Sequence, residues 1–225
     1  VYVDGKGAWS ATGRSAKQQA KLFDDDKEQV KLTAGIMWHK VERQTDEMGL
    51  KAELTTFVPY TQDKVELTKV TITNTADTTQ KITSTVAIPM YARSASNIRD
   101  HRHVTSLLHR TFTIKDGIMI YPTLTFDERG HNKNTVFYGA LAKEMVNGKM
   151  ESPVSFCPVT EEFIGEGGNF ENPYYVAKNK PLPYTEGQEV DGYETVAAIR
   201  FNDCELKPGE SRSYVIALEY GTSKE

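Results

Sequence analysis

The stretch 65-VELTKVTITNTADTTQKITSTVAIPMYA-92 decides the fold class that this sequence predicts. Its apolar residues recur at alternate positions in two runs: Val65, Leu67, Val70, Ile72, Ile82, Val86 and Ile88. Alternation with a period of two is typical of half-buried β-strands. The polar residues 74–80 between the runs have turn chemistry, so we expect an antiparallel hairpin. The change of phase at Lys69 predicts a β-bulge.

The same alternation continues outward on both sides. Before it, 50-LKAELTTFVP-59 places Leu50, Ala52 and Leu54 on one face and ends at Pro59. After it, 112-FTIKDGIMIYP-122 predicts a hairpin at Asp116-Gly117. Further strands are expected at 135–142, 195–201 and 213–221, with a turn at 206–211 before the last. The sequence therefore predicts an all-β protein, a large antiparallel β-sandwich that forms a single domain over residues 1–225.

Two features break this pattern. Val104, Leu107 and Leu108 have helical spacing and predict one short helix. Residues 160–193 are rich in Gly, Asn, Pro and Glu and predict a long loop without regular structure, which usually carries function or is disordered.

Composition narrows the function classes. With a net charge of −4 over 225 residues, the chain lacks the basic surplus that nucleic-acid binding requires. The two cysteines, Cys157 and Cys204, give no disulfide framework and fit a reducing compartment, so we expect a cytoplasmic protein. No apolar run approaches the roughly 20 residues of a membrane span.

The segment 97-NIRDHRHVTSLLHR-110 concentrates three histidines, three arginines and an aspartate. His101 and His103, with Asp100 nearby, could hold zinc or iron, but the interleaved Arg99 and Arg102 oppose a dication, so we expect no metal and no cofactor. Arginine forks and neutral histidines also suit a polyhydroxylated or phosphorylated ligand.

Aromatic and acidic residues offer further candidates. Side chains that could stack on sugar rings are Trp9, Trp38, Tyr91, Tyr174 and Tyr175, although core packing is the expectation for Trp38. Paired carboxylates for glycoside hydrolysis could come from Glu161, Glu162 and Glu166, but adjacent acidic residues on a polar loop are usually only solvated. No phosphate loop or nucleophile elbow is present, so residue chemistry favours a binding or structural role and no catalytic residue.

Three segments carry a family resemblance: 87-AIPMYARSASNIRDHRHVTSLLHR-110, 122-PTLTFDERGH-131 and 163-FIGEGGNFENP-173. They resemble the N-terminal β-sandwich domain of glycoside hydrolase family 94, which holds inverting phosphorylases such as cellobiose phosphorylase and 1,2-β-oligoglucan phosphorylase. The same module occurs in cyclic β-1,2-glucan synthetase. The resemblance runs from residue 7 to residue 221, and its 93–110 segment looks like the β-1,2-glucan branch.

The resemblance implies a galactose-mutarotase-like super-sandwich joined to a catalytic (α/α)6 barrel. That barrel, expected C-terminal of these residues and absent from them, carries the general acid and the phosphate site. Inorganic phosphate is the co-substrate of such an enzyme and attacks the anomeric carbon with inversion, giving glucose 1-phosphate. We therefore expect a sandwich that is truncated at its N-terminus, that is inactive alone, and that serves a phosphorylase of β-glucans.

The resemblance also implies where sugar is contacted. In the family a sandwich loop reaches a sugar-binding cleft, often that of the partner subunit in a homodimer, and the cellobiose branch has Asn-x-Gln-Arg there. The sequence 107-LLHR-110 takes that place, so His109 and Arg110 are expected to contact the sugar. The residues expected to build the same loop are Arg99, Asp100, His101, Arg102 and His103, and those on supporting loops are Arg93, Arg129, His131, Glu166 and Asn169.

Two alternatives remain beside this interpretation. The chain could be a module of a cyclic β-1,2-glucan synthetase. It could also be a purely structural domain whose polar segment docks on the catalytic barrel.

Overall fold

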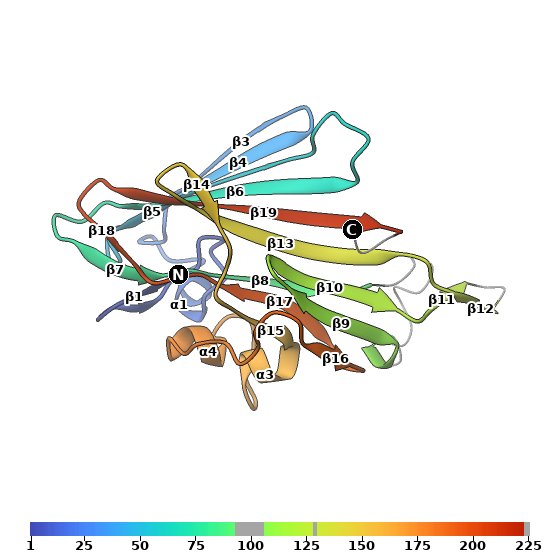
Figure 1. The fold of residues 1–225 in the computed structure, drawn as a ribbon. Coiled ribbons are helices and arrows are strands. Elements are labelled where there is room, and N and C mark those ends of the chain that lie inside the picture. The colour runs from blue at the N-terminus through green and yellow to red at the C-terminus, as the bar shows by residue number, and fades with distance from the viewer. Residues whose placement is uncertain (93–105, 128–129, 223–225) are drawn as a thin grey trace.

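The computed structural model describes residues 1–92, 106–127 and 130–222. Within these residues the strands form layered antiparallel sheets, and a ten-stranded sheet, here called the large sheet, curves over the smaller ones (Figure 1). Its strands, in spatial order, are β16 (Glu189–Asp191), β9 (His109–Ile114), β10 (Gly117–Pro122), β13 (Phe137–Val146), β19 (Ser211–Gly221), β6 (Val65–Asn74), β5 (Leu50–Phe57), β4 (Trp38–Thr45) and β3 (Val30–Gly35), with β14 (Lys149–Glu151) beside β13.

Smaller sheets complete the layers. A three-stranded sheet, here the small sheet, has the order β15 (Ser155–Val159), β17 (Thr195–Arg200), β8 (Thr85–Met90). The end sheet has the order β18 (Cys204–Leu206), β7 (Gln80–Thr83), β1 (Tyr2–Val3), β2 (Gly7–Ala8). A separate hairpin joins β11 (Leu124–Asp127) to β12 (Gly130–Lys133), and the described helices are α1 (Ala16–Ala20), α3 (Thr160–Ile164) and α4 (Tyr174–Ala177).

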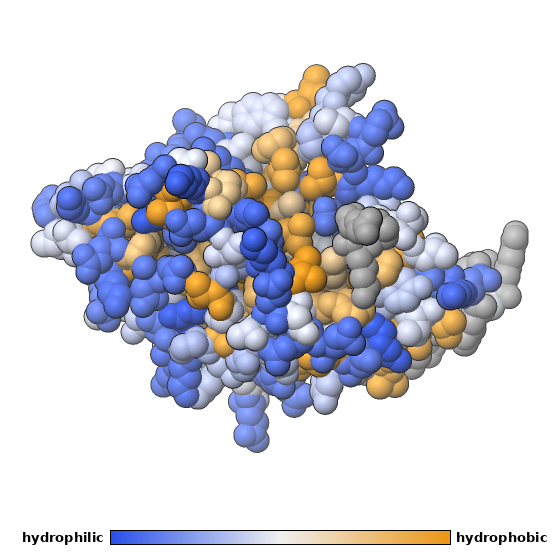
Figure 2. Space-filling model, in the orientation of Figure 1, coloured by the Kyte–Doolittle hydropathy of each residue, from blue (hydrophilic) through white to orange (hydrophobic). Residues whose placement is uncertain are grey.

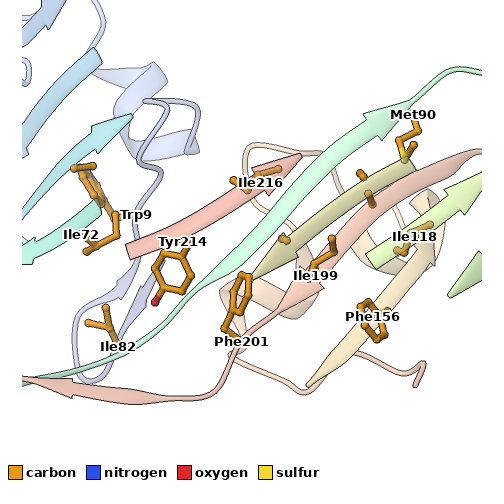
Figure 3. Close-up of a cluster of buried hydrophobic side chains, with 14 of the residues drawn as sticks. Trp9, Ile72, Ile82, Met90, Ile118, Phe156, Ile199, Phe201, Tyr214 and Ile216 are labelled. Carbon is orange, nitrogen blue, oxygen red and sulfur yellow. The ribbon is translucent and has the colours of Figure 1, made fainter. Parts of the chain in front are cut away.

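The main core lies between the large sheet and the two smaller ones. Ile72 and Ile216 come from neighbouring strands of the large sheet, while Ile82, Ile199 and Phe201 belong to the chain on the opposite side (Figure 3). Each fully buried Ile or Phe contributes about 1.5–3 kcal/mol through removal of its apolar surface from water. The apolar residues that alternate along the sequence thus form the inner faces of both layers.

A second, smaller core lies where α3 and α4 pack against the small sheet. It contains Cys157 and Val196 from the sheet and Phe163 from α3. Every residue of β17 is buried, because the main core covers one of its faces and these helices the other. A strand covered on both faces reads as a continuous apolar run, as in 196-VAAI-199.

The predicted all-β sandwich is confirmed, and so is the hairpin at residues 112–122. In that hairpin Gly117 pairs with Ile114, so the loop residues are Lys115 and Asp116. Gly117 is required because a Cβ there would overlap the Ala140 carbonyl oxygen on β13.

The hairpin predicted within 65–92 is wrong. β6 pairs with β5 and β19, whereas β7 and β8 belong to the end sheet and the small sheet. The intervening polar segment crosses between layers: the Asn74 side-chain amide donates to the carbonyls of Thr78 and Leu206, and the Gln80 amide donates to the Gly49 carbonyl. These bonds give hydrogen-bond partners to backbone carbonyls where the chain crosses between the layers. The polar composition of the segment does not distinguish such a crossing from a hairpin turn.

The β-bulge predicted at Lys69 is also wrong. The pairing of β6 with β5 runs without a shift from Leu50↔Asn74 to Phe57↔Leu67. Val70 and Ile72 share their core with β5, so Val65 and Leu67, which are out of phase with them, lie on the other face. The change of phase marks a strand with apolar residues on both faces.

Residues 160–193 contain α3, α4 and β16, so the prediction of a loop without regular structure is wrong for these parts. α1 was equally unexpected, although Ser15 and Gln18 form a capping box at its start. Helices of four or five residues span little more than one turn, too short for a periodic signal. Of the predicted helix, Ser106 and Leu107 are helical, and Val104 lies outside the described residues.

Candidate functional site

Most of the predicted sugar-contacting loop falls outside the described residues. Arg93, Arg99, Asp100, His101, Arg102 and His103 all lie within 93–105, and Arg129 lies within 128–129. His131 is on β12, but its side chain is not described. The geometry of the site therefore comes from His109 and Arg110, from Glu166 and Asn169, and from the residues around them.

His109 begins β9 and faces inward. The strand alternates, so that His109, Thr111 and Thr113 are buried while Arg110 and Phe112 are partly exposed. The His109 ring is 1% exposed, and its Nδ1 lies 3.5 Å from Oγ1 of Thr195 on β17, which in turn lies 3.1 Å from Oγ1 of Thr111. This differs from the sugar-facing position that the sequence predicts, because the strand pattern turns this residue toward β17.

Three contacts with other described residues hold Arg110 at the surface. Its Nε lies 3.3 Å from Oδ2 of Asp191 on β16, and its Nη1 donates to the carbonyls of His109 at 2.9 Å and Leu107 at 3.3 Å. The side chain is 37% exposed, so the guanidinium remains accessible while its orientation is defined. An ion pair this exposed contributes less than about 1 kcal/mol to stability, so its chief effect is to orient the guanidinium.

Glu166 and Asn169 lie on the exposed loop that follows α3. The Asn169 Oδ1 accepts hydrogen bonds from the backbone N–H groups of Glu171 and Asn172, which is a turn-stabilising pattern. The Glu171 carbonyl accepts from the Ala16 backbone N–H at 3.0 Å, so the loop is tied to α1. The structure thus connects these two residues with the N-terminal segment, and it shows no bond from them to Arg110 among the described residues.

A cavity of 420 Å³ lies close to Arg110, and it was not predicted from the sequence. It is lined by Ser106, Leu107, Val159, Thr160, Glu161, Ile164, Gly192, Tyr193 and Glu194. Backbone bonds join its walls: Thr160 N–H donates to the Glu194 carbonyl, and Gly192 N–H donates to the His109 carbonyl. Tyr193 and Glu194 stand in a segment that the sequence predicts to be an unstructured loop, and no motif there marks them as part of a site.

A larger groove of 870 Å³ opens between the layers. Its walls are mainly apolar, with Val70 and Leu54 on the large sheet and Val86 and Ile88 on the small sheet. In the space-filling view, apolar side chains are visible at the surface between the two layers (Figure 2).

The aromatic candidates divide by burial. Trp9 is buried, and its Nε1 donates to Oε1 of Glu28 at 2.8 Å. Trp38 is 41% exposed, so the prediction that it packs in the core is wrong: it begins β4 beside a hairpin tip that projects from the large sheet. Tyr91 and Tyr174 are exposed, and Tyr175 packs edge-on against Tyr174.

Glu161 and Glu162 are exposed on α3, where Oε1 of Glu162 accepts a hydrogen bond from the Tyr184 hydroxyl. No cluster of three or more His, Cys, Asp or Glu side chains suited to a metal occurs in residues 1–92, 106–127 and 130–222. Cys157 and Cys204 are unpaired, and burial raises the pKa of Cys157 to about 12. No helix in the described parts of the chain is long and apolar enough to cross a membrane.

The chain is similar to one known protein family and to several solved structures. The family model described as "Glycosyl hydrolase 94, supersandwich domain" matches residues 3–225. Among solved structures, a GalM/aldose epimerase homologue from C. elegans is 11% identical with a TM-score of 0.45, covering 88% of this chain and 69% of that one. A polysaccharide lyase is 11% identical with a TM-score of 0.45, covering 86% and 23%. A GH36 α-galactosidase from Geobacillus stearothermophilus is 13% identical with a TM-score of 0.33, covering 97% and 27%. This chain thus spans about a quarter of the length of the last two, and no curated protein matches it.

Proposed function

This chain belongs to the glycosyl hydrolase 94 supersandwich domain family, and we propose that it is the non-catalytic, substrate-shaping domain of an inverting phosphorylase of β-glucans, with β-1,2-linked chains as substrate. The family match over residues 3–225 supports a carbohydrate-related sandwich domain. The β-1,2 linkage rests on the resemblance of residues 93–110 to that branch of the family.

One observation carries the proposal: Arg110 is oriented at the surface by Asp191 and by two carbonyl oxygens. A guanidinium fixed in this way donates hydrogen bonds to sugar hydroxyls without first having to be ordered, which lowers the entropic cost of binding. The buried His109 contributes through the backbone, because its carbonyl accepts from Arg110 and from Gly192. In this proposal Arg110 contacts the glucan and His109 positions it.

The chemical step lies outside this chain in the proposal. A catalytic (α/α)6 barrel of the same protein supplies the proton donor and the phosphate site, and inorganic phosphate is the co-substrate that accepts the glucosyl group. No metal ion or further cofactor takes part. We place the complete enzyme in the cytoplasm as a homodimer, a location with which two unpaired cysteines are consistent. The same site would serve a cyclic β-1,2-glucan synthetase that carries this module.

A structural interface role is the second candidate, and a specific surface favours it. The tip of the β3–β4 hairpin exposes Ile36 by 92%, together with Met37 and Trp38. Large apolar side chains exposed together are typical of surfaces that another protein domain covers.

Titration of this chain with sophorose and cellobiose, followed by NMR, tests the sugar-binding proposal. We expect sophorose to shift the signals of Arg110 and its strand neighbours, with weaker binding of cellobiose. Arg110→Ala should lower the sophorose affinity about tenfold or more, since a hydrogen bond from a charged donor contributes about 1.5–3 kcal/mol. The same variant should change the free energy of unfolding by less than about 1 kcal/mol.

Arg14→Ala is the matched control, because Arg14 is an exposed arginine in the segment before α1. It should leave sophorose binding unchanged. If neither sophorose nor cellobiose binds at millimolar concentration, this result would contradict the proposal and favour the interface role.

A further inference from the structure

The cavity beside Arg110 has the size and the connections of a ligand site. Its 420 Å³ falls within the roughly 300–1,000 Å³ of small-molecule pockets. Among the described residues, three chain segments form its walls: the residues before β9, the junction of β15 with α3, and the link from β16 to β17. Two of these segments, at Thr160 and Glu194, are joined by a backbone hydrogen bond of 2.9 Å.

The cavity lies next to the contacts of Arg110, although Arg110 itself is not one of its lining residues. Leu107, which lines the cavity, accepts a hydrogen bond from Arg110 Nη1 through its carbonyl. Gly192, which also lines the cavity, follows Asp191, the ion-pair partner of Arg110. A ligand that contacts Arg110 and continues past Leu107 therefore enters this cavity.

The lining chemistry matches an uncharged pyranose. Tyr193 is 53% exposed and offers an aromatic face, and Glu161 and Glu194 offer carboxylate oxygens that accept hydrogen bonds from hydroxyl groups. The Glu194 carboxylate is oriented by the Tyr91 hydroxyl, which donates to its Oε1 at 3.4 Å. Thr160 is buried in the lining, and its Oγ1 has no hydrogen-bond partner among the described residues.

The charge of the lining argues against an anionic ligand. The described residues that line the cavity include two carboxylates and no Lys or Arg, and carboxylates repel a phosphate or a sugar phosphate. The only cation that the described contacts place beside it, Arg110, is already paired with Asp191.

We propose that this cavity is a further glucosyl subsite, in which one pyranose unit of the glucan stacks on Tyr193 and bonds to Glu161 and Glu194 while the next two units of the chain lie at Arg110. The inference rests on the proposed sugar-binding function and adds to it the number of units recognised. It makes the affinity of the sandwich depend on chain length, because a disaccharide bound at Arg110 leaves this subsite empty and a trisaccharide fills it.

The test compares a β-1,2-linked disaccharide with the corresponding trisaccharide by isothermal titration calorimetry of this chain. Wild type should bind the trisaccharide about tenfold more tightly, the gain expected from one stacked ring and its hydrogen bonds. Tyr193→Ala should abolish this gain and leave the disaccharide affinity unchanged, whereas Tyr193→Phe, which keeps the ring, should retain most of it. Tyr60→Ala is the matched control, since Tyr60 is fully exposed elsewhere, in the loop between β5 and β6.

The outcomes separate this inference from the proposed function. If wild type binds neither sugar, the proposed function fails and the subsite with it. If both sugars bind but with equal affinity, or if Tyr193→Ala keeps the full gain of the trisaccharide, the subsite is wrong while the Arg110 contact stands. Competition of inorganic phosphate with the third unit would also overturn the subsite.

Discussion

A buried ion pair between two strands of the large sheet makes a sharp test of how this fold is stabilised. Glu144 on β13 is 2% exposed, and its Oε1 lies 3.5 Å from Nε of Arg212 on β19. Burial raises the pKa of Glu144 above its ordinary value, Arg212 lowers it in part, and Glu151 raises it. No hydrogen bond reaches Oε1 of Glu144 within the described residues, so Arg212 provides its main compensation.

Arg212→Met removes the charge and keeps a long side chain in place. The variant should lose about 3 kcal/mol of unfolding free energy at pH 7, because breaking one side of a buried pair leaves an uncompensated charge. Replacing Glu144 by Gln in the same chain should recover most of this loss, since the neutral amide needs no counter-charge.

The loss should depend on pH with a definite sign. A carboxyl whose pKa is raised on folding contributes stability that is fully present below its unfolded pKa, about 4.3, and is lost as the pH rises through the folded pKa. Arg212→Met raises the folded pKa of Glu144 further, so the loss should be smaller at pH 5 than at pH 7. The same reasoning predicts that Glu144→Gln alone has a flatter pH dependence than wild type above pH 4.5.

Urea unfolding of wild type, both single variants and the double variant at pH 5 and pH 7 measures these quantities. A loss below 1 kcal/mol for Arg212→Met at pH 7 would refute the reasoning. An equal loss at both pH values, or a double variant no more stable than Arg212→Met, would refute it as well.

Two further predictions concern packing. Gly117→Ala should destabilise the fold by about 2–3 kcal/mol, because its Cβ would overlap the backbone of Ala140; a change below 0.5 kcal/mol in urea unfolding would contradict this. Cys157 is fully buried and has a pKa of about 12, whereas Cys204 is partly exposed. In thiol labelling of the native protein at pH 8, Cys157 should therefore stay unmodified while Cys204 reacts slowly, and both should react after unfolding. Rapid labelling of Cys157 in the native protein would show that its core opens.

The candidate site was predictable only in part. Arg110 stands out in the sequence because it ends a dense run of arginine and histidine, and in the structure its side chain lies at the surface. Tyr193 and Glu194 gave no such signal. Both residues lie just before Thr195, which contacts His109, 86 positions away in the sequence. Only the packing of β17 against β9 therefore brings Tyr193 and Glu194 close to Arg110.

Alternation alone predicted strands over residues 50–59 and 65–75, and the structure has β5 and β6 there, with Ala52 and Ile72 in the main core. The tertiary structure decided which strands pair. β6 lies between β5 and β19, and its Thr71 bonds to Ser213, 142 residues away, instead of facing the strand that follows it. The physical reason is that every strand edge presents the same N–H and C=O groups, so a pattern along one strand specifies its buried face but not its neighbour. That choice depends on how the apolar faces of all the sheets pack together.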